Sequence, residues 1–271
     1  MKKKMFLFAV AGAFALQMSA QRLVVRMDDL GGSHAIDEAI IKCYQEGIGR
    51  STEIMVPTPW FLEGARMANE NPGLDVGLHV TLFSEWKEYK WRPLTHCPSL
   101  CDEDGYFFPN FDPRREYDPQ EVEAEIRAQI ELAKKYVKNL THISIHMGAT
   151  PLVQEILAKL STEYGLPEQP GPELNVDMLG FVFRKPGTSR AGEFLELLKK
   201  AEKGKTYWTI EHPGFDVAEM EGMFTRAGED VGEDRQDVTN TFTDPAILQY
   251  IRDNGIELVS FGDILRENKN K

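Results

Sequence analysis

Residues 22–32 read Arg-Leu-Val-Val-Arg-Met-Asp-Asp-Leu-Gly-Gly, and this stretch decides the fold. The apolar run from Leu23 to Met27 predicts a buried strand that ends at two adjacent carboxylates, Asp28 and Asp29. Buried carboxylates are costly unless something uses them. In a (β/α) barrel the carboxyl ends of the strands form the active face. Because neighbouring side chains of a strand point to opposite faces, we expect one acid to bind a metal ion and the other to move a proton.

The sequence that follows alternates strand patterns with helix patterns. Strands are expected at 52–56, 74–80, 141–146, 181–183, 207–210 and 256–260, and helices at 34–46, 61–69, 119–137, 150–163, 189–203 and after Thr243 or Asp244. Ser33 is the expected cap of the first helix, and Asp118-Pro119 begins the third. Repeated βα units of this length predict a parallel sheet, either open or closed into a barrel.

The first twenty residues have the three parts of an export signal. Residues 2–4 are lysines, residues 5–16 are apolar, and Met18-Ser19-Ala20 forms a cleavage site before Gln21. We expect residues 1–20 to be removed and residues 21–271 to form one domain in the periplasm or outside the cell. The apolar run is short for a membrane span. A retained anchor is therefore the lesser alternative, and no stable membrane insertion is expected after cleavage.

The formal net charge of −12 disfavours nucleic acid and anionic membranes as partners. It suits a protein that acts on neutral or cationic small molecules. The sequence leaves open whether the chain forms a homodimer. Among the three cysteines, Cys43 lies on the apolar face of a predicted helix. Cys97 and Cys101 are near enough in sequence for a disulfide, which their spacing neither predicts nor excludes.

A long aromatic segment at 83–117 interrupts the alternation of strands and helices. It follows a strand, so it belongs to the face where barrel enzymes bind their substrates. Trp86 and Trp91 are candidates to stack on a sugar ring, because flat aromatic surfaces suit the apolar faces of sugars. Burial within a packed insertion is the alternative for these side chains.

Three of the six histidines, His79, His146 and His212, fall at the carboxyl ends of predicted strands. Together with Asp29, two of them would make an Asp-His-His site that leaves positions open for water and substrate. Oxygen and nitrogen ligands of this kind suit zinc, cobalt, manganese or nickel and do not exclude magnesium. Each residue also has a purely structural alternative, as a helix cap or a hydrogen-bonded strand end.

His212 stands in the sequence Glu-His-Pro-Gly at the end of a late strand. Its ordinary pKa near neutrality suits a general acid for the leaving group. Arg235 and Asp237 are expected in a polar loop at 227–240, where they would bind substrate or brace the site.

At this point the chain resembles the YdjC-like (ChbG/HpnK) family of carbohydrate deacetylases. The matching segments occur in order over most of the chain. They are Arg26 to Gly31, Gly77 to Leu82, Pro98 to Leu100, Asp104 to Phe107, Glu125 and Gln129, Thr141 to Met147, Glu211 to Gly214, the region of Arg235, and Thr243 to Pro245.

The resemblance implies an α/β fold, a distorted, TIM-like (β/α) barrel, and a divalent metal ion. It implies a hydrolase that removes acetyl groups from N-acetylated amino sugars or oligosaccharides. Carried over by position, Asp29, His79 and His146 would bind the metal. Asp28 would be the general base toward the attacking water, and His212 a candidate acid. The metal would polarise the acetyl carbonyl.

Two positions depart from the family's pattern on the fourth strand, Asp-Ser-His-x-His. Ser144 stands at its aspartate and Gly148 at its second histidine. The first change removes a charge that tunes such sites, and the second opens space near the substrate.

Three alternatives stay open at this stage. They are a non-catalytic glycan-binding barrel, a hydrolase of another amide or ester, and a barrel glycosidase that uses two carboxylates. The presence of Asp28 beside Asp29 argues against a binding protein, because binding alone needs no base.

Overall fold

The computed structural model describes residues 20–181 and 188–270. Its centre is one sheet of seven parallel strands, in the order β4-β3-β2-β1-β6-β5, with β7 also paired to β1. The strands are β1 (Arg22–Leu30), β2 (Ser51–Ile54), β3 (Asp75–Val80), β4 (Leu140–Ile145), β5 (Asp177–Met178), β6 (Thr206–Glu211) and β7 (Glu257–Val259). One edge of β1 pairs with β6. The other edge pairs with β7 along its first half and with β2 along its second half.

The sheet curves without closing into a regular barrel. Within the described ranges, no ladder joins β4 to β5, and a single parallel bridge links Ile143 of β4 to Glu168. The fold is therefore a distorted (β/α) barrel, as expected. All strand pairs are parallel, so the carboxyl ends of β1, β3, β4 and β6 meet at one edge.

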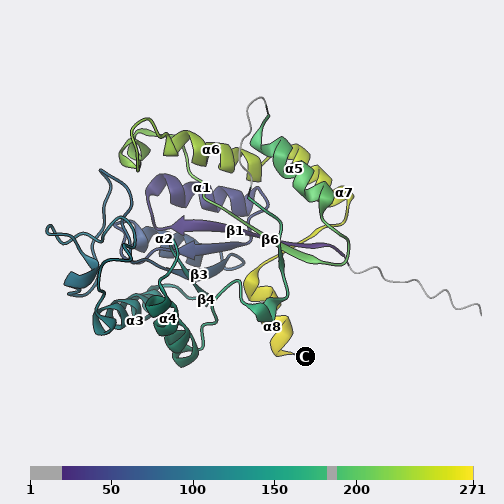
Figure 1. Cartoon of the computed structure of the whole chain (residues 1–271). Helices are drawn as coiled ribbons and strands as arrows, with labels where there is room; N and C mark the ends of the chain where they lie inside the picture. Colours follow the sequence, from purple (N-terminus) through teal and green to yellow (C-terminus); the bar gives the residue numbers. More distant parts are fainter. Residues whose placement is uncertain (1–19, 182–187, 271) are drawn as a thin grey trace, which may run out of the picture.

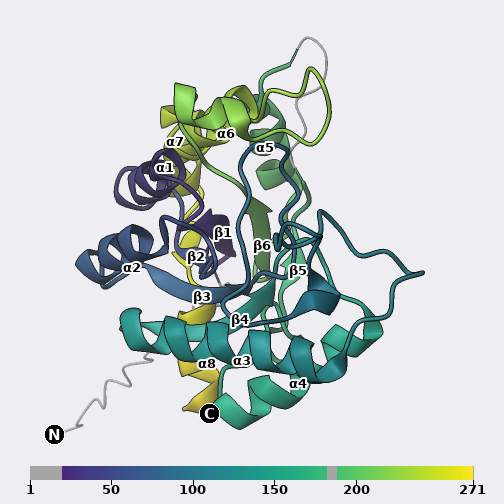
Figure 2. The same ribbon diagram turned by 90° about the vertical axis from the view of Figure 1, so that its left-hand side faces the viewer.

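Helices surround this sheet (Figure 1). They are α1 (His34–Gln45), α2 (Phe61–Glu70), α3 (Pro119–Tyr136), α4 (Pro151–Tyr164), α5 (Arg190–Lys200), α6 (Val231–Phe242), α7 (Pro245–Asp253) and α8 (Phe261–Lys269). Figure 2 shows α1 and α2 along one side of the strands, α3 and α4 along another, and α6 and α7 at the opposite end. The expected caps are present, since Ser33, Asp118 and Asp244 each accept a backbone N–H of the helix that follows.

The structure corrects one expected element and adds two, the short strand β5 and the helix α8. Arg235 and Asp237 lie in α6 and not in a polar loop, because Asp230 caps a helix whose inner side buries Val238 and Phe242. The sequence analysis did not anticipate α8, which begins with a capping box at Ser260. The strand expected at 181–183 falls largely outside the described residues, as do the first nineteen residues of the expected signal.

The long aromatic segment has little regular structure, apart from the short 3-10 helix η1 (Pro98–Leu100). Its Phe83, Trp91 and Phe107 are nevertheless buried in the core. Cys43 is buried on α1 as expected, and Cys97 and Cys101 are free thiols. Among the described helices, none combines the length and the apolar character that a membrane crossing requires.

Candidate metal and active site

A β-bulge at the end of β1 shapes the candidate site. Met27 pairs with Thr52, but Leu30 pairs with Ile54, so β1 has one extra residue between the two pairs. The backbone accommodates the extra residue at Asp29, which has a left-handed conformation with φ 76°. Aspartate tolerates this conformation better than most residues.

The bulge turns both carboxylates to the same side. His79 Nε2 lies 3.4 Å from Asp28 Oδ2 and 3.7 Å from Asp29 Oδ1. The expectation that Asp28 and Asp29 point to opposite faces of the strand is therefore wrong, because strict alternation requires a regular strand.

Asp29, His79 and His146 form a compact, buried cluster. One potential ligand atom from each residue lies within 4.8 Å of the other two. Asp29 Oδ1 is 3.5 Å from His146 Nδ1, and the two imidazole rings are 5.2 Å apart. The structure thus brings together the three residues that the sequence analysis grouped, from the ends of β1, β3 and β4.

One atom of this cluster lacks an ordinary partner. Asp29 Oδ2 accepts a hydrogen bond from Arg235 at 2.6 Å, whereas Oδ1 is buried without a hydrogen bond to any described residue. A buried carboxylate oxygen without a hydrogen bond is unusual. It faces one ring nitrogen of His79 and one of His146, so this donor set fits a divalent cation.

In each ring, the nitrogen that points away from Asp29 contacts a neighbouring side chain. His79 Nδ1 lies 2.7 Å from the hydroxyl of Ser144, and His146 Nε2 lies 3.0 Å from Glu85 Oε2. These contacts turn His79 Nε2 and His146 Nδ1 toward Asp29. Histidines that bind metal ions in proteins are commonly held in this way.

Asp28 is held by Arg26, which lies two residues earlier and so on the same side of β1. The guanidinium donates to both carboxylate oxygens, at 2.6 and 2.7 Å. Arg26 also lies 3.3 Å from Glu53 Oε1, and its Nη1 reaches the carbonyl of Gln169. The bidentate geometry fixes the orientation of the Asp28 carboxylate.

The charges of the cluster shift the pKa values of its members. Burial alone would raise the pKa of Asp29, but Arg235 and His146 outweigh it and hold that pKa well below its usual range. Burial opposes the charge on His146, yet Glu85 and Asp29 raise its pKa to about 10. Burial and the neighbouring His146 hold the pKa of His79 well below its usual value. Without a metal ion, the positive charge of the pair therefore resides on His146.

Arg235 braces the cluster. In addition to its bond to Asp29, its guanidinium carbon lies 5.3 Å from the ring centre of Trp86. The bracing role that the sequence left open therefore has a contact to support it, and binding of substrate by Arg235 stays a prediction. Asp237, on the same helix, pairs with Arg190.

Trp86 and Trp91 lie behind the site. They are only 4% and 2% exposed, and Trp91 packs with its ring centre 6.2 Å from that of His146. Neither offers an open ring face to a sugar in this structure. We correct their expected role from stacking surface to a wall that supports His146 and Arg235.

His212 follows β6 at the same edge and is partly buried. Burial lowers its pKa, and the nearby Asp29 carboxylate offsets part of that shift. The pKa of His212 therefore depends on the charge of the Asp29 carboxylate in the cluster.

Two carboxylates near the site, Glu53 and Glu85, were not predicted from the sequence. Glu53 lies within β2 and is fully buried, so an acid inside a predicted strand was the available signal. Glu85 lies in the irregular aromatic segment, where no periodic pattern singles it out.

The fold and the cluster place potential metal-binding groups at the carboxyl edge of a distorted (β/α) barrel, which is where barrel enzymes carry their active sites. The chain belongs to the YdjC-like protein family, whose model matches residues 22–253.

Similar proteins span nearly the whole chain. Carbohydrate deacetylase 2 of Listeria innocua serovar 6a is 27% identical over 255 residues, covering 90% of this chain and 98% of its own. The carbohydrate deacetylase of Brevibacillus brevis is 28% identical over 258 residues, covering 90% and 99%. The crystal structure of EF3048 of Enterococcus faecalis V583, provisionally described as a cellobiose-phosphate cleavage protein, has a TM-score of 0.75 at 24% identity and covers 91% and 99%. This last likeness supports the fold.

Proposed function

We propose that this protein is a metal-dependent deacetylase of N-acetylated amino sugars or their oligosaccharides. The observation that carries the proposal is the buried Oδ1 of Asp29, which has no hydrogen bond and faces ring nitrogens of His79 and His146 beside a second carboxylate, Asp28. The names of the relatives support a carbohydrate substrate and an acetyl group.

Asp29, His79 and His146 would hold the ion. When bound, a divalent ion there would supply Lewis-acid polarisation of the acetyl carbonyl and activation of water. Ser144 and Glu85 orient the two rings for this task, and Arg235 holds Asp29 from its other oxygen.

Asp28 is the proposed base. Its Oδ2 lies 3.4 Å from His79 Nε2, so its carboxylate borders the space that the three ligand atoms enclose. The Arg26 guanidinium fixes the carboxylate in one orientation, which is what a base needs in order to meet a proton at a fixed place.

His212 is the proposed acid for the leaving nitrogen. Its burial-lowered pKa leaves it neutral at rest and makes its charged form a strong proton donor. It must therefore take up a proton before it acts, and the carboxylate of Asp29 favours that uptake.

The test is metal analysis and acetate release on the same purified samples, with a panel of N-acetylated amino sugars. Wild type should bind one divalent ion and release acetate, and His79→Ala should lose both. His96→Ala is the matched control, because His96 is exposed outside the cluster. A shortened glycan without acetate would indicate a glycosidase. Binding without any product would indicate a glycan-binding protein. Acetate released from esters alone would place the activity on another bond.

We also propose that the protein is exported after cleavage before Gln21, on the basis of the signal pattern in residues 1–20.

A further inference from the structure

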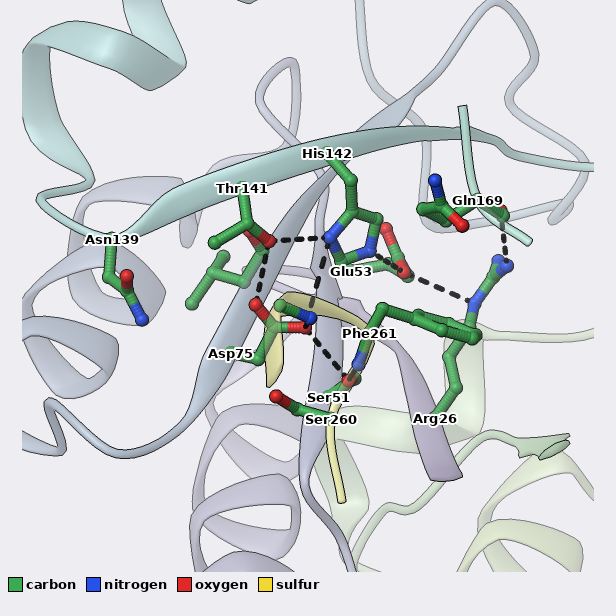
Figure 3. A network of polar contacts seen from close by, with 12 residues as sticks. Arg26, Ser51, Glu53, Asp75, Asn139, Thr141, His142, Gln169, Ser260 and Phe261 are labelled. Carbon is green, nitrogen blue, oxygen red and sulfur yellow. Dashed lines mark hydrogen bonds and ion pairs between the residues drawn. The ribbon is translucent and has the colours of Figure 1, made fainter. Parts of the chain in front are cut away.

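A polar network with Glu53, Asp75 and His142 among its buried members crosses β2, β3 and β4 (Figure 3). At its centre is Glu53, which is fully buried. Glu53 Oε1 lies 2.8 Å from His142 Nε2 and 3.3 Å from Arg26 Nε. Beyond His142, Thr141 donates to Asp75 at 2.6 Å. Two cationic or basic groups therefore flank Glu53 and keep it ionised.

Gly77 makes the crossing possible. Glu53, Gly77 and His142 are register partners on three neighbouring strands. A Cβ atom on Gly77 would overlap Glu53 Oε2 and His142 Nε2. The absence of a side chain at this central position lets Glu53 pass over β3 and reach β4.

Ser144 connects this network to His79. The two residues are register partners on β4 and β3. Ser144 Oγ lies 2.7 Å from His79 Nδ1 on one side and 2.7 Å from Glu53 Oε2 on the other. The chain of contacts therefore runs from Glu53 through one hydroxyl to one imidazole.

The chemistry of these groups fixes the direction of the hydrogen bonds. An ionised carboxylate only accepts, so the single hydroxyl proton of Ser144 points to Glu53. Ser144 Oγ must then accept from His79, which places a proton on Nδ1. In a neutral imidazole, Nε2 is left without a proton, and Nε2 is the atom that faces Asp28 and Asp29.

We propose that Glu53 is a positioning residue that acts through Ser144 to hold the His79 proton on Nδ1, so that Nε2 stays available to a metal ion. Glu85 has the corresponding place at His146, where it contacts Nε2 directly. Outer contacts of this type fix the tautomer and orientation of metal-binding histidines. The carboxylate that the family pattern has at position 144 is thus provided from β2, one hydroxyl further away.

Glu53→Gln gives the sharpest test, because it should reverse the chain of hydrogen bonds. Arg26 and His142 both donate toward Oε1, so the amide oxygen of the glutamine should take that place. The amide NH₂ then faces Ser144 and donates to it. The hydroxyl proton turns to His79 Nδ1, and the imidazole proton moves to Nε2.

The readout is the tautomer of His79 in metal-free protein, measured by two-bond ¹H–¹⁵N correlation NMR with ¹⁵N-histidine labelling. We expect the Nδ1–H form in wild type, the Nε2–H form in Glu53→Gln, and loss of the Nδ1–H preference in Ser144→Ala. Ser144→Thr keeps a hydroxyl and should restore the wild-type signal. The matched control is Ser51→Ala, which removes a buried hydroxyl that contacts Asp75 at the other end of the network.

A second readout is the affinity for zinc, measured by competition with a chelator. Glu53→Gln and Ser144→Ala should weaken binding by about 10–100-fold, the range found when such outer partners are removed, and Ser51→Ala should not. This readout rests on the proposed function, whereas the tautomer does not. If the tautomers behave as expected but the protein binds no zinc, the proposed function is wrong and the role of Glu53 and Ser144 in setting the His79 tautomer is supported.

An Nε2–H form of His79 in wild type would overturn the inference without any variant. So would an unchanged tautomer in both Glu53→Gln and Ser144→Ala. If a variant fails to fold, the wild-type tautomer together with Ser144→Thr still decides the question.

Discussion

Gly77→Ala is the substitution that the packing around the site penalises most clearly. The new methyl group would overlap the ends of Glu53 and His142. Flexible side chains could move aside, but both of these are fully buried. Glu53 is also held by Arg26, His142 and Ser144 together, so it can move only by breaking those contacts.

The expected cost follows from two terms. Overpacking in a dense core costs about 1–3 kcal/mol, and each lost hydrogen bond to a charged group costs about 1.5–3 kcal/mol. We therefore expect Gly77→Ala to lower the free energy of unfolding by about 3 kcal/mol or more. Because His79 loses its support through Ser144, zinc affinity should also fall.

Urea unfolding followed by tryptophan fluorescence measures the first effect, with the slope compared between proteins. Gly222→Ala is the control, since its nearest neighbour would be Glu88 Cβ at an ordinary 3.5 Å. A Gly77→Ala protein within about 0.5 kcal/mol of wild type, the usual range for a neutral substitution, would refute the packing argument.

Two further predictions concern single residues, and a third concerns the leader at residues 1–20. Asp28→Asn should keep the metal ion and lose about 10²–10⁴-fold in turnover, as expected for a general base; loss of both metal and activity would instead make Asp28 a ligand. Burial raises the pKa of Asp37 to about 8, far above the value of about 3.9 in an unfolded chain. Between these values the folded state keeps the proton of Asp37 and the unfolded state does not, so the contribution of Asp37 to the free energy of unfolding should decline as pH rises from about 4 to about 8. Asp37→Asn should remove that decline, and parallel unfolding curves across this pH range would contradict it. N-terminal sequencing of exported native protein should begin at Gln21, and an intact leader on protein found in the cytoplasm would reject the export prediction.

Much of the fold could be predicted because its signals are local. The caps at Ser33, Asp118 and Asp244 and the apolar strand runs mark helices and strands within a few residues of their observed ends. The polar segment that forms α6 gave no such signal. Its buried face has only two large apolar side chains, Val238 and Phe242, which lie one turn apart. The other buried side chains of this face are polar, among them Arg235 and Thr239, so no apolar stripe marks the helix.

The residues of the metal cluster could be predicted from the sequence, but their geometry could not. Strand ends of a parallel sheet meet at one edge, so Asp29, His79 and His146 could be grouped from sequence. The bulge at Asp29 could not, because it depends on the pairing of β1 with β2. The roles of Glu53 and Ser144 depend in the same way on register across three strands and on the space above Gly77.

The most direct test of the account is anomalous diffraction from crystals of the protein loaded with zinc. We predict one strong peak per chain within bonding distance of Asp29 Oδ1, His79 Nε2 and His146 Nδ1, since zinc binds oxygen and nitrogen ligands at about 2.0–2.2 Å. A fully loaded crystal with its peak elsewhere, or with these three atoms still turned toward one another around an empty space, would contradict the central claim.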